Sequence, residues 1–418
     1  MSEFATVYKS KLTTPADAVG RIASGVNVSM GMAMTEPPAL LKALADRAAA
    51  GKVDDLKIYY FESTSIAGKT ILRYELTDRI HPYCMFMAAV ERALIKKGEE
   101  DGGRKVLTYV PSNFHESPRL LTEHISIDTF LVTVSPMDRH GYFTFGTGND
   151  YSSKVARAAK HLIVEVNDQM PRVYGSLAQL HVSEVEAIVE NNVPILELPV
   201  RASGPEDTVI GKTVAEMVPD GACLQMGVGA LPDLVCSYLR GRKDLGIHTE
   251  ALCPGMIDLI EAGVVTNRRK RINPGKTVFT FAMGQKAMYD FLDDNPSVES
   301  HPVDYVNDPH VIAQNDNVVS VNAALQIDLT APSTPNTCLN TNTAPQGANS
   351  TSCVALTPLG AASRSSPATR QQPRERYRAL SPAWKAPSPL RAWTLTSSSR
   401  NSAGQTSRGS HRGSAPRR

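Results

Sequence analysis

The sequence has no long apolar run, no closely paired cysteines and no secretory leader. No stretch approaches the ~18 consecutive apolar residues of a membrane-spanning helix, so no membrane partner is expected. The first residues lack a basic stretch that leads into an apolar run, so we predict no signal peptide. The six cysteines include no Cys-x-x-Cys pair, which argues against a disulfide scaffold or a zinc site. These absences predict a cytoplasmic protein.

Acidic and bulky apolar residues are almost missing from residues 331–418. This segment contains no Ile, Phe, Met or Asp and a single acidic residue, Glu375, against 11 Arg and one Lys. The whole chain carries a net charge of only +2, so residues 1–330 hold the compensating acidic excess. A segment this poor in apolar side chains cannot offset the ~1–2 kcal/mol per residue that ordering a backbone costs. We therefore predict a disordered basic tail at 331–418.

Strand-like and helix-like segments alternate through the rest of the chain. Helices are predicted at 37–50 and 86–97. Residues 201–212 contain the loop-forming run Ala-Ser-Gly-Pro-Glu-Asp, which places a domain boundary between 1–205 and 206–330. The alternation favours an α/β fold with largely parallel sheets. Runs rich in Ile, Val, Leu and aromatic residues predict buried strands at 57–61, 129–134, 162–166 and 193–198.

The second predicted domain repeats this alternation. Residues 223–226 are typical of a strand, and apolar residues recur at helical spacing over 231–239. A further strand is predicted at 278–282. Residues 317–329 alternate apolar and polar side chains, as a half-buried strand does.

A glycine loop, residues 227–231, lies between the predicted strand and helix of this domain. A Gly-x-Gly turn at a helix start can hold an anion, because glycine lets a ligand approach the backbone N–H groups. Pro232 stands where a dinucleotide-binding fingerprint has its third glycine, and no acidic residue stands out as its ribose partner. The loop is therefore either a tight structural turn or part of a site for another anionic ligand.

The run Leu-Gly-Ile-His-Thr-Glu at 245–250 follows soon after this loop. A glutamate carboxylate at a strand end can attack an acyl group and form a covalent intermediate, if nearby dipoles stabilise the developing oxyanion. By itself such a glutamate is more often a surface or capping residue. Glu250 is a candidate nucleophile because it follows a glycine turn able to hold an anionic ligand, and on these residues alone both interpretations stay open.

Several motifs follow one another in the order found in one enzyme family, and on them the chain resembles it from about Tyr8 to Thr330. It is similar to the acetyl-CoA hydrolase/transferase family, the family I CoA-transferases, which include 4-hydroxybutyrate CoA-transferase. The motifs are Tyr-Val-Pro-Ser-Asn-Phe-His-Glu (109–116), Val-Ser-Pro-Met-Asp-Arg-His-Gly-Tyr-Phe (134–143), Gly-Val-Gly-Ala-Leu-Pro-Asp (227–233), Asp-Leu-Gly-Ile-His-Thr-Glu (244–250) and Ile-Glu-Ala-Gly-Val-Val-Thr (260–266).

The resemblance implies two similar open α/β domains with the active site between them. It places the family's nucleophile on Glu250, which attacks an acyl-CoA such as acetyl-CoA and becomes a glutamyl-CoA thioester through a mixed anhydride. A short-chain carboxylate such as acetate or 4-hydroxybutyrate then takes up CoA. The family implies no metal, no permanently bound cofactor, no specific nucleic acid and a homodimer. The residues implied to hold part of CoA are Gly227, Val228, Gly229, Ala230 and Leu231.

The Gly31-Met32 turn and the loop at 135–141 are implied to line the acyl pocket. Two features depart from the family. Ala-Leu-Cys-Pro-Gly replaces the usual Met and Ser-Asp-Gly at 251–255, and the family's Gly-Gly-Gln-x-Asp-Phe loop is missing after Thr330. We hypothesise a reading-frame shift near codon 330 that truncates the second domain, which translation of the other two frames tests.

Three functions stay open from the sequence: a CoA-transferase, an acetyl-CoA hydrolase, or a catalytically dead product whose basic tail binds polyanions nonspecifically. Two further motifs leave alternatives. Cys253 is either a packed side chain or a reactive thiol. The basic run at 268–271 is either a solvated face or a contact for CoA phosphates.

Overall fold

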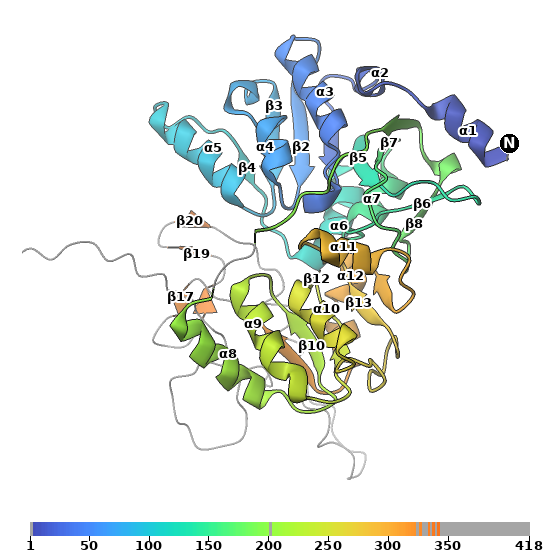
Figure 1. Cartoon of the computed structure of the whole chain (residues 1–418). Coiled ribbons are helices and arrows are strands. Elements are labelled where there is room, and N and C mark those ends of the chain that lie inside the picture. The colour runs from blue at the N-terminus through green and yellow to red at the C-terminus, as the bar shows by residue number, and fades with distance from the viewer. Residues whose placement is uncertain are drawn as a thin grey trace, which may run out of the picture.

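The computed structural model describes residues 3–199 and 203–322, and the backbone of the short strands β17 (Gln326–Ile327), β18 (Ser333–Thr334), β19 (Thr337–Cys338) and β20 (Thr341–Asn342). The chain folds into two α/β lobes, an N-terminal lobe (3–199) and a C-terminal lobe (203–322) (Figure 1). The predicted α/β class with parallel sheets is confirmed. Apart from β18, β19 and β20, the predicted tail at 331–418 lies outside the described residues.

The N-terminal lobe is built on one seven-stranded parallel sheet in the order β4-β3-β2-β1-β5-β7-β9. Alternate residues of β5 face opposite cores: Phe130 and Val132 on one side, Leu131 on the other. The strands are β1 (Asn27–Met30), β2 (Leu56–Tyr60), β3 (Ile80–Cys84), β4 (Thr108–Tyr109), β5 (Thr129–Val134), β7 (His161–Val166) and β9 (Ala187–Glu190).

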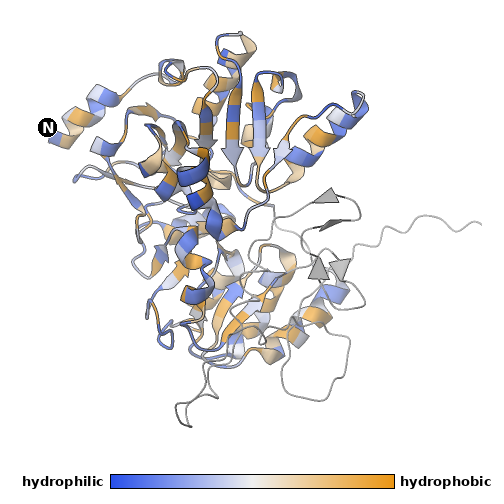
Figure 2. Ribbon diagram, turned by 180° about the vertical axis from the view of Figure 1, so that it is seen from behind, coloured by the Kyte–Doolittle hydropathy of each residue, from blue (hydrophilic) through white to orange (hydrophobic). Residues whose placement is uncertain are grey.

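Helices cover both faces of this sheet, and an antiparallel pair, β6 (Tyr142–Thr144) and β8 (Gln179–His181), lies beside it (Figures 1 and 2). Helices on both faces are what a buried parallel sheet requires. The helices are α1 (Glu3–Lys11), α2 (Pro15–Gly20), α3 (Pro38–Ala49), α4 (Ser65–Lys69), α5 (Ala89–Glu100), α6 (Ser117–Arg119) and α7 (Ser152–Ala158). Figure 2 shows apolar residues in bands along the strands and helices.

The strand order reverses at β1, which pairs with β2 on one side and β5 on the other. In open α/β sheets, ligands bind outside the carboxyl ends of the strands at such a reversal. The segments that leave these carboxyl ends begin at Gly31, Phe61 and Ser135. The N-terminal lobe therefore presents these three segments to the C-terminal lobe.

The C-terminal lobe has shorter strands in several small parallel sheets. One sheet has the order β11-β10-β16, with β10 (Cys223–Met226), β11 (Gly246–Ile247) and β16 (Val318–Val321). Two others pair β12 (Ala251–Leu252) with β14 (Phe281–Ala282) and β13 (Thr277–Phe279) with β15 (Val298–Ser300). The helices are α8 (Pro205–Met217), α9 (Ala230–Tyr238), α10 (Pro254–Glu261), α11 (Lys286–Leu292), α12 (Val303–Val306) and α13 (Pro309–Ile312).

One predicted strand was wrong and another is interrupted. Residues 193–198 form no strand; they run as an irregular segment whose end bonds to the C-terminal lobe, with Leu198 N–H donating to Gly284 (2.9 Å). The predicted strand 278–282 is interrupted at Thr280, whose carbonyl accepts N–H bonds from Asn149 and Asp150 (3.0 and 3.2 Å). In both cases the backbone bonds the opposite lobe instead of completing a regular ladder.

The predicted boundary at 201–212 overlaps α8, because Pro205 starts that helix and Asp207 bonds the Gly204 N–H (2.8 Å). The domain limits 1–205 and 206–330 stay a prediction. Of the predicted strand 317–329, β16 is confirmed, whereas residues 323–325 and 328–329 lie outside the described residues.

The two lobes share buried side chains and hydrogen bonds. One hydrophobic cluster contains Met32 and Phe114 from the first lobe with Ala251 and Phe281 from the second. Asn149 is fully buried and donates both amide hydrogens, to Ser176 and Ser300 carbonyls at 2.9 Å. The mutual position of the lobes is thereby fixed by packing and by backbone carbonyls. Within the described residues, no helix is long and apolar enough to cross a membrane.

Candidate active site

Glu250 lies in the gap between β11 and β12, where its backbone is held from three sides. The N–H of His248 donates to Leu224 (3.1 Å) in β10, and the N–H of Thr249 donates to Val278 (2.9 Å) in β13. The Glu250 carbonyl accepts from Thr280 (3.0 Å) and from the neighbouring Phe281 (3.2 Å). The residue predicted as nucleophile is therefore fixed although it belongs to no strand.

The side chain of Glu250 is half-buried and has one direct polar partner in the described structure. The amide Nδ2 of Asn307, a buried residue directly after α12, donates to Oε2 of Glu250. Burial raises the pKa of Glu250 to about 7, and the bond from Asn307 opposes that rise. One carboxylate oxygen is thus oriented, while the other has no hydrogen-bond partner among residues 3–199 and 203–322.

Aromatic side chains from both lobes pack against one another in the cluster that contains Ala251, the residue after Glu250. Phe61 stacks on Phe114 (ring centroids 4.0 Å apart), and Phe114 meets Phe281 edge-on (6.1 Å). Phe281 is also the residue whose N–H holds the Glu250 carbonyl. These three rings share one buried cluster with Ala251, so an apolar region lies next to the backbone of the nucleophile.

A second carboxylate, Glu62, follows β2 and faces the nucleophile across the lobe junction. Burial, and next the nearby charges of Glu91 and Glu250, together raise the pKa of Glu62 to about 7. Glu62 and Asn307 were not predicted from the sequence, since nothing in the local sequence marks either one. The only available signal was that Glu62 follows a predicted strand, at its carboxyl end.

Two other buried carboxylates nearby are structural. Glu36 accepts hydrogen bonds from the N–H and hydroxyl of Thr64 (2.8 and 2.5 Å) and from Ala67 N–H (3.1 Å), although burial still raises its pKa to about 8. Glu91 accepts from Tyr60 (3.0 Å), Ser63 (2.5 Å) and Ala88 N–H (2.9 Å). Within the described residues, no group of three or more His, Cys, Asp and Glu side chains is arranged to hold a metal ion.

The glycine loop joins β10 to the start of α9, on the same edge as Glu250. Thr249 connects the two, because its hydroxyl lies 3.3 Å from both the N–H and the carbonyl of Met226, the residue before the loop. Gly229 has a φ of 133°, a conformation that favours glycine, and Val228 is 43% exposed. The N–H of Gly227 is already bonded to Val321 (2.8 Å). Only the later N–H groups of the loop are therefore available to a ligand.

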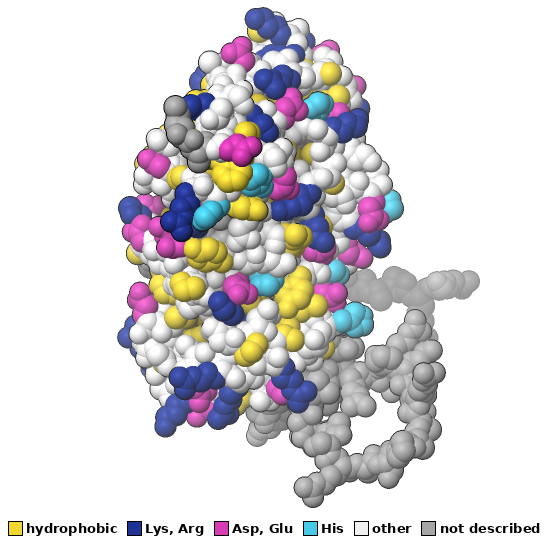
Figure 3. All heavy atoms as spheres, turned by 90° about the vertical axis from the view of Figure 1, so that its right-hand side faces the viewer, with side chains coloured by type: hydrophobic (Ala, Val, Ile, Leu, Met, Phe, Trp, Pro, Cys, Tyr) yellow, Lys and Arg dark blue, Asp and Glu magenta, His cyan; other side chains and the backbone are white. Residues whose placement is uncertain are grey.

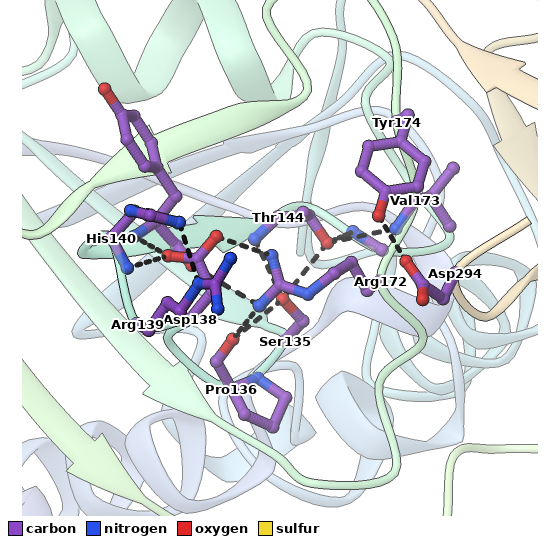
Figure 4. Close-up of polar contacts among 12 residues, drawn as sticks. Ser135, Pro136, Asp138, Arg139, His140, Thr144, Arg172, Val173, Tyr174 and Asp294 are labelled. Atoms are coloured by element: carbon purple, nitrogen blue, oxygen red, sulfur yellow. Dashed lines mark hydrogen bonds and ion pairs between the residues drawn. The ribbon is translucent and has the colours of Figure 1, made fainter. Parts of the chain in front are cut away.

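The two segments implied for the acyl pocket have different surroundings. Met32 is buried in the cluster that contains Ala251 and Phe281, next to the nucleophile. The loop at 135–141 bonds instead to Arg172, whose guanidinium donates to the Pro136 carbonyl (2.7 Å) and lies 3.5 Å from Asp138 (Figure 4). The N–H of Arg172 in turn donates to Asp293 (2.7 Å) in the C-terminal lobe. This loop therefore braces the junction of the lobes.

Cys253 is buried, and its thiol contacts that of Cys236, with the result that its pKa is raised well above the ordinary value. A buried thiol of raised pKa is unreactive, so packing is the better description. In the basic run 268–271, Lys270 is buried and donates to the carbonyls of Ile247 and Lys276, both at 2.7 Å. The interpretation of the whole run as a solvated face was therefore wrong for this residue.

Basic and acidic side chains alternate over the face shown in Figure 3. Such a mixed surface offers a polyanion no extended basic track on that side of the molecule. The basic tail, on which the nonspecific binding of polyanions depends, lies outside the described residues.

Comparison with known proteins agrees with this geometry. Residues 2–198 match the acetyl-CoA hydrolase/transferase N-terminal domain, and residues 284–346 match the acetyl-CoA hydrolase/transferase C-terminal domain. The chain is 39% identical over 322 residues to the succinyl-CoA:cyclohexane-1-carboxylate CoA transferase of Geobacter metallireducens, covering 77% of this chain and 71% of that protein. The chain belongs to the acetyl-CoA hydrolase/transferase family.

Further relatives agree with this assignment. The 4-hydroxybutyrate coenzyme A transferase of Clostridium kluyveri is 38% identical over 328 residues, which cover 78% of this chain and 74% of that enzyme. The crystal structure of RipA from Yersinia pestis superposes with a TM-score of 0.79 at 65% identity, covering 79% of this chain and 77% of that chain. The predicted family and enzyme class, the CoA-transferases, are therefore confirmed.

Proposed function

We propose that this chain moves CoA between an acyl-CoA and a carboxylate, with Glu250 as the covalent nucleophile. The observation that carries the proposal is the position of this carboxylate. It lies at the junction of the lobes, next to the buried cluster that contains Phe114, Phe281 and Ala251. One of its oxygens is oriented by Asn307. A desolvated carboxylate is a stronger nucleophile than one fully hydrated in water.

The reaction proceeds in two covalent steps and their reversal. The free oxygen of Glu250 attacks the thioester carbonyl; a C–O bond forms, the C–S bond breaks, and CoA leaves as a thiolate. The thiolate then attacks Cδ of Glu250 in the mixed anhydride, which forms a C–S bond and releases the donor carboxylate. An incoming carboxylate reverses both steps and leaves with CoA. Water in place of that carboxylate gives hydrolysis.

Asn307 and Glu62 have opposite electrostatic roles in this scheme. When the thiolate attacks Cδ, negative charge develops on the oxygen that Asn307 contacts, so its amide stabilises the tetrahedral intermediate. Glu62 repels the Glu250 carboxylate, and this repulsion disappears once Glu250 is an anhydride or a thioester. Glu62 thus favours conversion of the charged Glu250 carboxylate into the uncharged anhydride or thioester.

For CoA itself we propose the glycine loop, with the N–H groups after Gly227 facing a phosphate or the pantetheine amides. The donor is a short-chain acyl-CoA such as acetyl-CoA, and the acceptor is a carboxylate such as acetate or 4-hydroxybutyrate, in line with the enzyme of Clostridium kluyveri named above. The family resemblance also supports a homodimer and a cytoplasmic location. Light scattering of the purified protein and cell fractionation test these two proposals.

The decisive experiment traps the enzyme-bound thioester. The purified full-length chain is incubated with acetyl-CoA and treated with borohydride, which reduces a glutamyl thioester to an alcohol, or with hydroxylamine, which converts it to a hydroxamate. Peptide mass spectrometry should locate the change on Glu250, at a level that depends on acetyl-CoA. Glu250→Gln should lose it, whereas Glu261→Gln, an exposed residue of α10, should retain it. An unmodified Glu250 in the parent chain contradicts the proposal.

A further inference from the structure

His248 completes a ring of contacts around the nucleophile. Its Nε2 lies 2.9 Å from the carbonyl oxygen of Val306. The next residue, Asn307, donates to Glu250, and Glu250 is two residues after His248. Two side-chain hydrogen bonds and two short pieces of backbone therefore form a closed loop. The nucleophile and its amide partner are tied together a second time through this imidazole.

The protonation state of His248 follows from its surroundings. The side chain is only 4% exposed, and Nδ1 has no hydrogen-bond partner within the described residues. Because a carbonyl can only accept, Nε2 carries the proton. Burial, and next the charge of Lys270 and that of His301, lower the pKa of His248 to about 3, against the bond to Val306. The ring is therefore neutral near neutral pH and has a fixed tautomer.

Asn307 needs such an anchor because α12 comprises only four residues, Val303–Val306, and so short a helix holds its own end weakly. The helix is also held through Tyr305. Tyr305 stacks on His301 (4.9 Å) and donates its hydroxyl to Asn273 (2.9 Å). The bond from His248 is made at the last residue of the helix.

We propose that His248 is a positioning residue: its bond to the Val306 carbonyl holds the Asn307 amide against one oxygen of Glu250 and leaves the other oxygen free to attack. This inference rests on the proposed role of Glu250. It assigns His248 no contact with substrate and no proton transfer.

Removal of the imidazole donor should change the pKa of Glu250, which loss of packing alone should not do. The bond from Asn307 favours the charged form of Glu250, so its loss raises the pKa of that carboxyl. Glu62 is the charged group that faces Glu250 from the other lobe, and it stays in place. The titration of Glu250 should therefore move to higher pH in a variant that still folds.

The test compares His248→Leu, which removes the donor, with His248→Gln, whose terminal amide keeps one at similar reach. Carbodiimide labels protonated carboxyl groups, so the extent of labelling of Glu250, measured by peptide mass spectrometry against pH, gives its titration without turnover. We expect His248→Leu to move the midpoint up by about 0.5–1 pH unit and His248→Gln to retain the parent midpoint. Asn307→Ala should show the same shift, and adding His248→Leu to it should add nothing.

Equal midpoints in the parent and His248→Leu, or additive shifts in the double variant, would overturn the proposal. If circular dichroism shows that His248→Leu does not fold, His248→Asn replaces it, since its amide is too short to reach Val306. In turnover with acetyl-CoA, kcat should fall roughly 10–100-fold, with KM little changed. A parent chain that forms no glutamyl-CoA refutes the proposed function, but the labelling comparison still decides the role of His248.

Discussion

The two lobes differ in how their strands are arranged into sheets. The N-terminal lobe builds one continuous seven-stranded sheet, whereas the C-terminal lobe divides its strands among small sheets. The nucleophile lies among the small sheets of the C-terminal lobe, in the gap between β11 and β12. A residue within a regular buried strand has its backbone saturated and its side chain packed. An interrupted strand allows a polar side chain to face the junction while neighbouring strands hold its backbone.

The carboxylates of the two regions show the same contrast. Glu36 and Glu91, inside the N-terminal lobe, each accept three hydrogen bonds. Glu250 accepts one at the junction, and Glu62 feels the charges of its neighbours. Saturated carboxylates stabilise the fold, whereas carboxylates with unused oxygens remain available for chemistry.

The largest effect is expected from disturbing the contact that joins the lobes. A Cβ on Gly175, which has a φ of 145°, would lie 1.8 Å from the Ser300 carbonyl oxygen. Gly175→Ala should lower the free energy of unfolding by roughly 3 kcal/mol or more, as measured by urea denaturation. Gly241→Ala is the matched control, because a Cβ there meets no atom within 4 Å. Equal stability of the two variants would contradict this prediction, because it would show that the lobes can shift to accommodate the added methyl group.

The second prediction concerns the pH dependence of the first covalent step. Glu250 attacks as a carboxylate and its pKa is about 7, so glutamyl-CoA formation should rise roughly tenfold per pH unit below that value and level off above it. Rapid quench at several pH values followed by mass spectrometry measures this rate. A rate independent of pH from 5 to 8 would refute the assignment.

The smallest effect concerns stability. Burial and the charges of Glu91 and Glu250 raise the pKa of Glu62 from 4.5 to about 7. The stability linked to this raised pKa is fully present below pH 4.5 and is lost as pH rises through 7. Glu62→Gln removes that loss, so the stability of the variant relative to the parent should improve by roughly 2.5 kcal/mol between pH 5 and pH 8. Urea unfolding at both pH values measures it, and a constant difference would contradict the linkage.

Much of the N-terminal lobe could be predicted because its buried parallel strands are continuous apolar runs. The predicted strand 129–134 coincides with β5. Residues 193–198, Val-Pro-Ile-Leu-Glu-Leu, are also rich in aliphatic side chains, yet they form no strand, and the end of the segment bonds to the other lobe. Composition does not reveal whether a neighbouring strand is available, and the interruption at Thr280 has the same cause.

The sequence by itself determined the α/β class, the glycine loop and Glu250 as the candidate nucleophile, because these depend on local runs of residues and on motifs. Only the tertiary structure brought Asn307, 57 residues further along the chain, onto the carboxylate and placed Glu62 opposite it. It also decided that His248 bonds the end of α12. Such contacts arise from the way two lobes pack, and packing joins residues whose separation along the chain leaves no local pattern.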